Sequence, residues 1–283
     1  MTSLALTDHG VMFGAVEFYK AAKDRGIKPI IGMEAYVSPR RMEQREGKQD
    51  ASGYHFVLLA ENETGYRNLI QLSSRAYLEG YYMKPKVDWE LLEAHHEGLI
   101  VTTGCLGGQV LQALMQGDFE GAVEKAARLQ DIFGRDNLFI ELQDHGIPEQ
   151  RLTNPQLLEI ARKIGAPLLA TNDSHYTDQA DHEAHDALLC VQTGSLMSDP
   201  DRLKFHGDQH YLKTAAEMRQ VFAEVPEACD NTLWIAERAN VEITFGKPQL
   251  PDFPIPEGFA DAAAYLEHLT FSGALILRAI SSS

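Results

Sequence analysis

The feature that most constrains the fold of this chain is the alternation of short apolar runs with amphipathic segments from the N-terminus to about Tyr176. This alternation is typical of strands joined by crossover helices, and it predicts an α/β protein. A barrel and an open parallel sheet both fit the pattern, and we favour the barrel. The strands that we expect cover residues 3–7, 29–37, 55–60, 99–103, 138–142 and 167–171.

One segment between these runs carries clear helix signals. Asn154 is a suitable N-cap, Pro155 can occupy the first helical position, and Gly165 can end the helix. The sequence therefore predicts a helix over residues 155–164.

The sequence changes character after Tyr176, where helical segments are separated by proline and glycine. Four prolines between Pro248 and Pro256 then indicate a linker. No acidic residue follows Glu267, and we assign no function to this tail. We expect a barrel in residues 1–190, a helical segment in residues 191–247, and a linker with an atypical tail in residues 248–283.

The charge and the cysteines limit the classes of function. The 283 residues include 41 acidic and 25 basic side chains, a formal net charge of -16. This excess repels a phosphate backbone, so tight nucleic-acid binding would need metal ions or a local basic patch. Three widely spaced cysteines favour a reducing cytoplasm over a disulfide framework. With neither a signal peptide nor an apolar run of roughly 20 residues, we expect a cytoplasmic protein without a membrane segment.

Side chains that can bind metals follow several of the expected strands. His9, Cys105, Asp173 and His175 each come just after a strand, where the loops of an α/β barrel form the active site. Asp173 and His175 would project to the same side of an extended backbone, so they could share a metal ion or flank two. Alternatively, Asp173 could be a helix N-cap and His175 a surface residue. Cys105 could be a buried small side chain or a catalytic nucleophile.

Two further candidates fit this pattern less simply. Glu34 is the charged residue of the apolar run PIIGMEAYV. A buried carboxylate is costly unless it is paired or metal-bound, although on an edge strand Glu34 could face water. His55 begins its expected strand instead of ending it, so the barrel rule does not explain its position. By default we expect the remaining histidines on the surface: His95, His96, His145, His182, His185, His206, His210 and His268.

Taken together, several long blocks resemble the polymerase and histidinol phosphatase (PHP) domain of bacterial DNA polymerase III alpha subunits. The blocks are TDHGVMFGAVEFYKAAKDRGIKPIIGMEAYVSP, HFVLLAEN, TTGCLGG, LATNDSHY and ALLCVQTG, and the similarity extends from about residue 2 to residue 270. The resemblance implies a distorted seven-stranded, TIM-like α/β barrel followed by a helical extension.

The resemblance also implies a metal site. The family's barrel can hold up to three divalent ions, with zinc or manganese expected, on nine side chains. Catalytic roles would fall to Asp173, His175 and His9. By motif, six of the nine ligands correspond here to His9, Glu34, His55, Cys105, Asp173 and His175.

The family's opening strand, with a His-x-His motif and a following Asp, would precede Met1. We therefore expect a barrel that lacks its first strand and a site that holds fewer ions. One ion would keep Glu34, His55 and Cys105, whereas the other two would keep pairs of ligands. An opened barrel exposes strand edges, so we expect poor expression or aggregation.

The family's activities lead to one main hypothesis and two alternatives. The parent would be a DNA-directed DNA polymerase, with DNA and other replisome subunits as partners, and this domain would supply a phosphoesterase or 3'-5' exonuclease activity. The aspartates of the polymerase palm lie beyond this chain in the family, so we do not expect it to polymerise DNA. The alternatives are a structural module braced by metal ions and a free-standing PHP phosphatase that acts on a small phosphate ester.

Overall fold

The computed structural model describes residues 1–247 and 251–281. Its contacts divide the chain into two compact units, Met1–Glu242 and Ile243–Ser283. Residues 248–250, where we expect the proline-rich linker to begin, and residues 282–283, at the end of the atypical tail, lie outside the described residues. The finer division of the chain at residues 190 and 247 stays a prediction.

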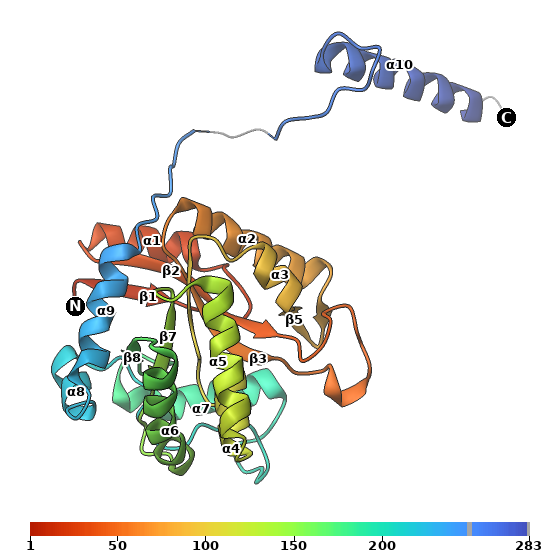
Figure 1. Cartoon of the computed structure of the whole chain (residues 1–283). Coiled ribbons are helices and arrows are strands. Elements are labelled where there is room, and N and C mark those ends of the chain that lie inside the picture. Colours follow the sequence, from red (N-terminus) through yellow and green to blue (C-terminus); the bar gives the residue numbers. More distant parts are fainter. Residues whose placement is uncertain (248–250, 282–283) are drawn as a thin grey trace. The chain divides into compact units, whose positions relative to one another are not determined.

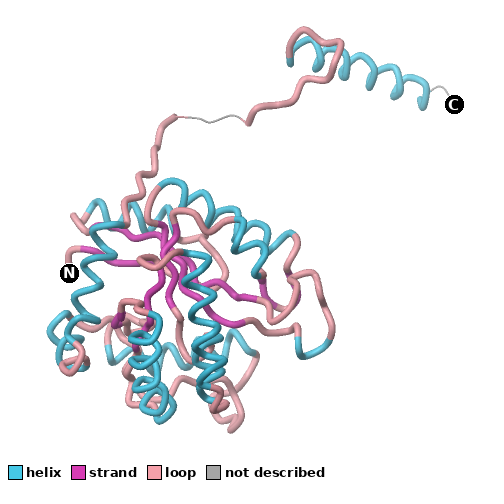
Figure 2. Tube along the Cα trace, viewed as in Figure 1, coloured by secondary structure: helices cyan, strands magenta, loops and turns pink. Residues whose placement is uncertain are grey.

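A curled, mixed β-sheet forms the centre of the unit Met1–Glu242 (Figure 2). Hydrogen bonds connect its described strands in the order β4-β5-β2-β3-β6-β7-β8, and β1 pairs with the first half of β2. This sheet confirms the α/β class and the barrel-like curvature. The strands are β1 (Ser3–Leu6), β2 (Lys28–Val37), β3 (Tyr54–Ala60), β4 (Tyr81–Tyr82), β5 (Lys84–Val87), β6 (Leu99–Thr102), β7 (Leu138–Leu142) and β8 (Leu168–Ala170).

Helices surround the curled sheet (Figure 1). In α2, for example, the Asn62 side chain caps the first turn by accepting a hydrogen bond from the backbone N–H of Gly65 at 3.1 Å. None of the described helices is long and apolar enough to cross a membrane. The helices of this unit are α1 (Ala15–Asp24), α2 (Glu63–Leu78), α3 (Trp89–Ala94), α4 (Gln109–Met115), α5 (Phe119–Phe133), α6 (Pro148–Ile164), α7 (His182–Thr193), α8 (Ala215–Val221) and α9 (Pro226–Arg238), with 3₁₀ turns at Gly47–Gln49 and Gln179–Asp181.

The unit Ile243–Ser283 contains helix α10 (Ala262–Ser281). This helix covers most of the atypical tail. Its first turn contains no acidic residue.

The predicted start of α6 is wrong. The helix begins at Pro148, and Pro155 lies inside it. Asn154 is not a cap, because its side chain donates a hydrogen bond to the backbone oxygen of Gln143 at 3.0 Å. The predicted end is confirmed, since Gly165 adopts the left-handed conformation with φ 67°.

The direction of β3 departs from the parallel arrangement of strands that are joined by crossover helices. β3 runs antiparallel to both β2 and β6, whereas β2 is parallel to β1 and to β5, and β7 is parallel to β6 and to β8. His55, at the start of β3, therefore lies opposite Tyr36, near the end of β2. The reversal places His55 at the edge where the parallel strands end, which explains the one position that the barrel rule left unexplained.

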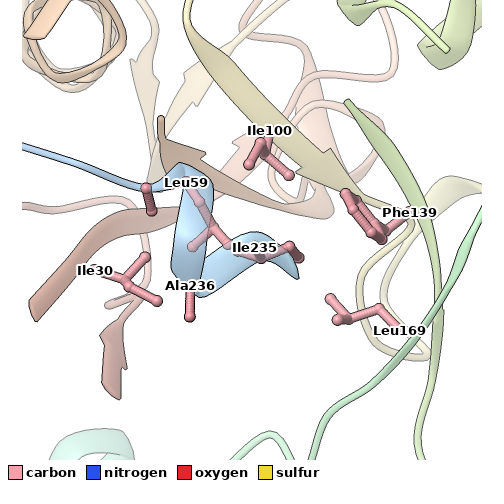
Figure 3. Packing of buried hydrophobic residues seen from close by; sticks show 8 residues of the cluster. Ile30, Leu59, Ile100, Phe139, Leu169, Ile235 and Ala236 are labelled. Carbon is pink, nitrogen blue, oxygen red and sulfur yellow. The ribbon is translucent and has the colours of Figure 1, made fainter. Parts of the chain in front are cut away.

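Helix α9 packs across the opposite end of the sheet (Figure 3). Ile235 and Ala236 of α9, and Ala239 directly after it, are buried against apolar side chains near the starts of the parallel strands. Asn231 of α9 also donates a hydrogen bond to the backbone oxygen of Leu168 in β8 at 2.7 Å. Apolar side chains therefore fill this end of the sheet. The strand residues of this cluster are Ile30, Leu59, Ile100, Phe139 and Leu169.

Candidate metal centre

The TDHG turn after β1 is held directly against β2. The backbone N–H of Gly10 donates to the backbone oxygen of Glu34 at 2.9 Å, and the N–H of Glu34 donates to the oxygen of Asp8 at 3.0 Å. Gly10 has φ 67°, and a Cβ there would lie 2.9 Å from Cγ of Pro85. Glycine therefore permits the close turn that presents His9 beside Glu34.

Glu34, His55 and Cys105 come together at this edge of the sheet, and we call them the thiol cluster. The Nδ1 atom of His55 lies 2.7 Å from Oε1 of Glu34. The Sγ atom of Cys105 lies 3.5 Å from Nδ1 of His55 and 3.7 Å from Oε1 of Glu34. The glycine-rich turn brings the thiol in, because a Cβ on Gly104 would lie 2.5 Å from the backbone oxygen of His55.

The charge states in the thiol cluster depend on its burial. Glu34 is 4% exposed; burial alone would raise its pKa, but the hydrogen bond to His55 and the nearby imidazoles of His9, His55 and His175 lower it overall. Burial, together with the Glu34 and Asp173 carboxylates, raises the pKa of Cys105 well above its ordinary value. A divalent cation would supply the positive charge that a thiolate needs here.

Asp173 and His175 approach from the turn after β8. Asp173 has φ 43°, in the left-handed region, and its backbone oxygen lies 2.7 Å from Nδ1 of His175. The distance from that Nδ1 to Oδ1 of Asp173 is 3.8 Å. Burial, and then the Glu34 and Glu141 carboxylates, raise the pKa of Asp173 to about 6, although His175 opposes the shift.

His9 lies between the thiol cluster and the pair formed by Asp173 and His175. Its ring centroid is 5.2 Å from that of His55 and 5.9 Å from that of His175, and its Nδ1 lies 3.7 Å from Oε2 of Glu34. Burial lowers the pKa of His9, which favours the neutral imidazole that binds metals, although Glu34 acts in the opposite direction. The structure thus brings together the six residues expected from the sequence, and metal binding by them stays a prediction.

Two buried polar residues beside the cluster were missed. The Glu141 carboxylate, 3% exposed, accepts hydrogen bonds from the side chains of Thr102, Thr171 and Gln143. Burial raises its pKa. The sequence contains the signal for this residue, because Glu141 is the charged residue of the apolar run LFIEL, as Glu34 is of its own run.

His210 is the second missed residue. The default surface position is wrong for His145 and His210, which are 6% and 4% exposed and stack with ring centroids 3.8 Å apart. Burial, followed by His145, lowers the pKa of His210 to about 3. No sequence pattern distinguishes this histidine from those on the surface.

The donor atoms fit divalent metal ions in two groups. The candidate ligand atoms of His9, Glu34 and His55 lie within 4.8 Å of one another, and so do those of Asp173, His175 and His210. Carboxylate, imidazole and thiolate together form a donor set that suits zinc, and the carboxylate and imidazole groups also suit manganese.

A cavity of about 780 Å³ opens beside these residues. Its walls come from β1, β8, α8 and α9, and they include His9, Glu34, Cys105, Asp173 and His175. In the described residues β1 and β8 are not paired with each other. The cavity therefore lies where a further strand could hydrogen-bond to both, and the expectation of such a strand stays a prediction.

Comparison with models of known protein families identifies the family of this chain. The family model of the PHP domain matches residues 1–145, which include His9, Glu34, His55 and Cys105. The chain belongs to the PHP domain family.

The similar proteins are named as DNA polymerase III alpha subunits. The chain is 49% identical over 272 residues to the DNA polymerase III subunit alpha of Treponema pallidum, 45% over 277 residues to that of Borreliella burgdorferi, and 46% over 281 residues to that of Thermus aquaticus. Each match covers 96% of this chain but only 23% or 24% of the relative. The chain thus spans about a quarter of the length of these relatives.

Proposed function

We propose that this chain is the PHP module of a DNA polymerase III alpha subunit, and that it binds divalent metal ions to hydrolyse phosphodiester bonds at the 3' end of DNA. The observation that carries the proposal is the thiol cluster, in which a carboxylate oxygen, an imidazole nitrogen and a thiol sulfur lie within 3.7 Å of one another. These atoms come from β2, β3 and the turn after β6, so their meeting depends on the whole sheet.

Each side chain has a definite part in this proposal. Glu34, His55 and Cys105 would hold one ion, and Asp173 and His175 would serve the neighbouring position. His9, whose side chain is 39% exposed, would face the substrate from the rim. The bound ions would lower the pKa of a water molecule and neutralise the phosphodiester. That neutralisation matters because the chain carries a net charge of -16, which repels DNA.

The proposal extends to the partners and the location of the protein. As part of an alpha subunit, the chain would meet DNA and other replisome subunits in the cytoplasm. Cys105, Cys190 and Cys229 are free thiols in the structure, which supports a reducing compartment.

A structural role is the second candidate. Buried Glu34 and Cys105 would be stabilised by an ion even without turnover, so metal could brace the sheet and support a polymerase core. A free-standing phosphatase is less well supported, because 96% of the chain matches polymerase subunits.

One experiment separates these candidates. Single-stranded DNA labelled at its 3' end is incubated with manganese or zinc and with the chain, alone or extended by the family's opening strand. Release of 3' nucleotides that Asp173→Asn abolishes supports the nuclease, and full activity of that variant contradicts it. Asp131→Asn, on the exposed side of α5, is the matched control.

Two other outcomes identify the alternatives. Tight metal binding and a melting temperature that chelator lowers, without hydrolysis of any substrate, would favour the structural module. Hydrolysis of histidinol phosphate but not of DNA would favour the free-standing phosphatase.

A further inference from the structure

We propose that His210 is a metal ligand and that, with Asp173 and His175, it forms a nitrogen- and oxygen-donor site for a divalent transition-metal ion such as zinc. This site lies beside the thiol cluster. The proposal deepens the proposed function and rests on it, since both need metal ions at this edge of the sheet. The motifs shared with the PHP family give His210 no role.

The first observation is an unsatisfied nitrogen. His210 is 4% exposed, yet its Nε2 atom has no hydrogen-bond partner among the described residues. A buried polar atom without a partner costs about 1–3 kcal/mol. A purely structural residue at this position could be apolar and would avoid that cost, so the bare nitrogen indicates a missing partner.

The second observation is the orientation of two imidazoles by one carbonyl group. The backbone oxygen of Asp173 lies 2.7 Å from Nδ1 of His175 and 3.3 Å from Nδ1 of His210. A carbonyl oxygen only accepts hydrogen bonds, so each Nδ1 carries the proton and each Nε2 keeps its lone pair. Metal-binding histidines are commonly oriented in this way, with the other ring N–H donated to a carbonyl or carboxylate.

The backbone conformation of Asp173 explains how its carbonyl oxygen can accept hydrogen bonds from both imidazole rings. Asp173 has φ 43°, a conformation that costs energy for residues other than glycine and that asparagine and aspartate tolerate best. A carboxylate oxygen of Asp173 also lies within 4.8 Å of one ring nitrogen of each imidazole. One residue thus orients both nitrogen donors and supplies the oxygen donor.

The third observation is that the segment bearing His210 is firmly fixed to the turn after β8. The backbone N–H of His175 donates to the oxygen of His210 at 2.8 Å. The Asn172 side chain donates to the backbone oxygens of Gln209 and Tyr211, at 2.8 and 2.7 Å. These bonds hold His210 in place although it lies 35 residues beyond His175.

The ring of His210 is also held by its neighbours. It stacks on His145 with centroids 3.8 Å apart, and Phe205 lies at 4.8 Å. His145 is itself fixed, because its Nε2 lies 2.9 Å from the backbone oxygen of Asn172. A ligand that is already oriented loses little freedom when the ion binds. Two imidazoles and one carboxylate suit zinc and the neighbouring divalent ions better than calcium or magnesium.

The test uses cobalt as a spectroscopic probe of the full 283-residue chain. Cobalt bound to the thiol cluster gives a sulfur-to-metal charge-transfer band, whereas cobalt bound by Asp173, His175 and His210 does not. We expect His210→Gln to retain that band and to weaken cobalt binding at the second site by at least about tenfold, the smallest loss typical of residues that support metal ligands. Metal content after dialysis against zinc should fall in parallel.

Two comparisons control for folding. His206→Gln changes an exposed histidine four residues away and should bind cobalt at both sites as the unchanged chain does. His210→Phe keeps an aromatic ring on His145 but removes the nitrogen, so it should lose the second site while its circular dichroism spectrum is unchanged.

The outcomes separate this inference from the proposed function. Cobalt binding at both sites in His210→Gln and His210→Phe would overturn the role of His210 and leave the thiol cluster intact. Absence of the charge-transfer band in the unchanged chain, with the second site still filled, would instead count against the thiol cluster.

Discussion

Replacing Asp173 by asparagine should stabilise the metal-free chain while it weakens zinc binding. The pKa of Asp173 rises from its ordinary value of 3.8 to about 6 because of burial and the Glu34 and Glu141 carboxylates. The folded chain therefore binds this proton more tightly than the unfolded chain does. This tighter proton binding adds to the free energy of unfolding. The added stability is fully present below about pH 4, and it is lost as the pH rises through about 6.

The magnitude follows from the size of this pKa change. Each pKa unit corresponds to about 1.4 kcal/mol, so ionised Asp173 costs the folded chain about 3 kcal/mol at pH 8 and about half of that at pH 5. Asparagine carries no charge and tolerates the φ of 43° as well as aspartate does. When a chelator keeps the chain free of metal, Asp173→Asn should raise the free energy of unfolding by about 3 kcal/mol at pH 8 and by about half of that at pH 5.

Urea unfolding at pH 8 and pH 5 measures the effect, first with chelator and then with saturating zinc. Zinc at 100 times its dissociation constant should stabilise the unchanged chain by about 2.7 kcal/mol, and Asp173→Asn should lose most of this gain. The control Asp131→Asn should change stability by less than about 0.5 kcal/mol in every condition. Destabilisation of metal-free Asp173→Asn at pH 8, or an effect that does not vary with pH, would refute the reasoning.

Two further predictions concern stability. Glu141→Ala should lower the free energy of unfolding by about 3 kcal/mol, because two buried donors and one partly buried donor lose their acceptor; an unchanged urea midpoint would contradict this. Gly65→Ala should lower the melting temperature, since its Cβ would overlap the backbone oxygen of Gly98, whereas Gly14→Ala, with 3.4 Å to its nearest neighbour, should be tolerated.

Six of the eight described strands were predictable because each is a short apolar run with clear ends. The expected run 138–142 coincides with β7, and the others differ from the observed strands by one residue at one end or at both ends. Apolar pattern alone does not reveal strand direction, which is why the antiparallel β3 was not foreseen. β5 was missed because its sequence KPKV looks solvated, although Lys86 is fully buried and donates to the backbone oxygen of Tyr82 at 2.6 Å.

Part of the candidate site was predictable because residue type and strand position agreed, whereas the assignment of His55 depended on the resemblance to the PHP family. His9, Cys105, Asp173 and His175 follow strands, and the fold brings them together with Glu34 at one edge. His210 could not be found in this way, because hydrogen bonds between two distant segments place it there. Those contacts depend on the folded backbone and leave no local pattern in the sequence.

X-ray absorption at the zinc edge, on the zinc-loaded chain, tests the central claim most directly. If Glu34, His55 and Cys105 hold an ion, the spectrum should contain a sulfur neighbour at about 2.3 Å together with nitrogen or oxygen neighbours at about 2.0–2.2 Å. The sulfur should disappear in Cys105→Ser, which leaves Cys190 and Cys229 in place. A zinc shell without sulfur in the unchanged chain, or a sulfur that persists in Cys105→Ser, would contradict the account.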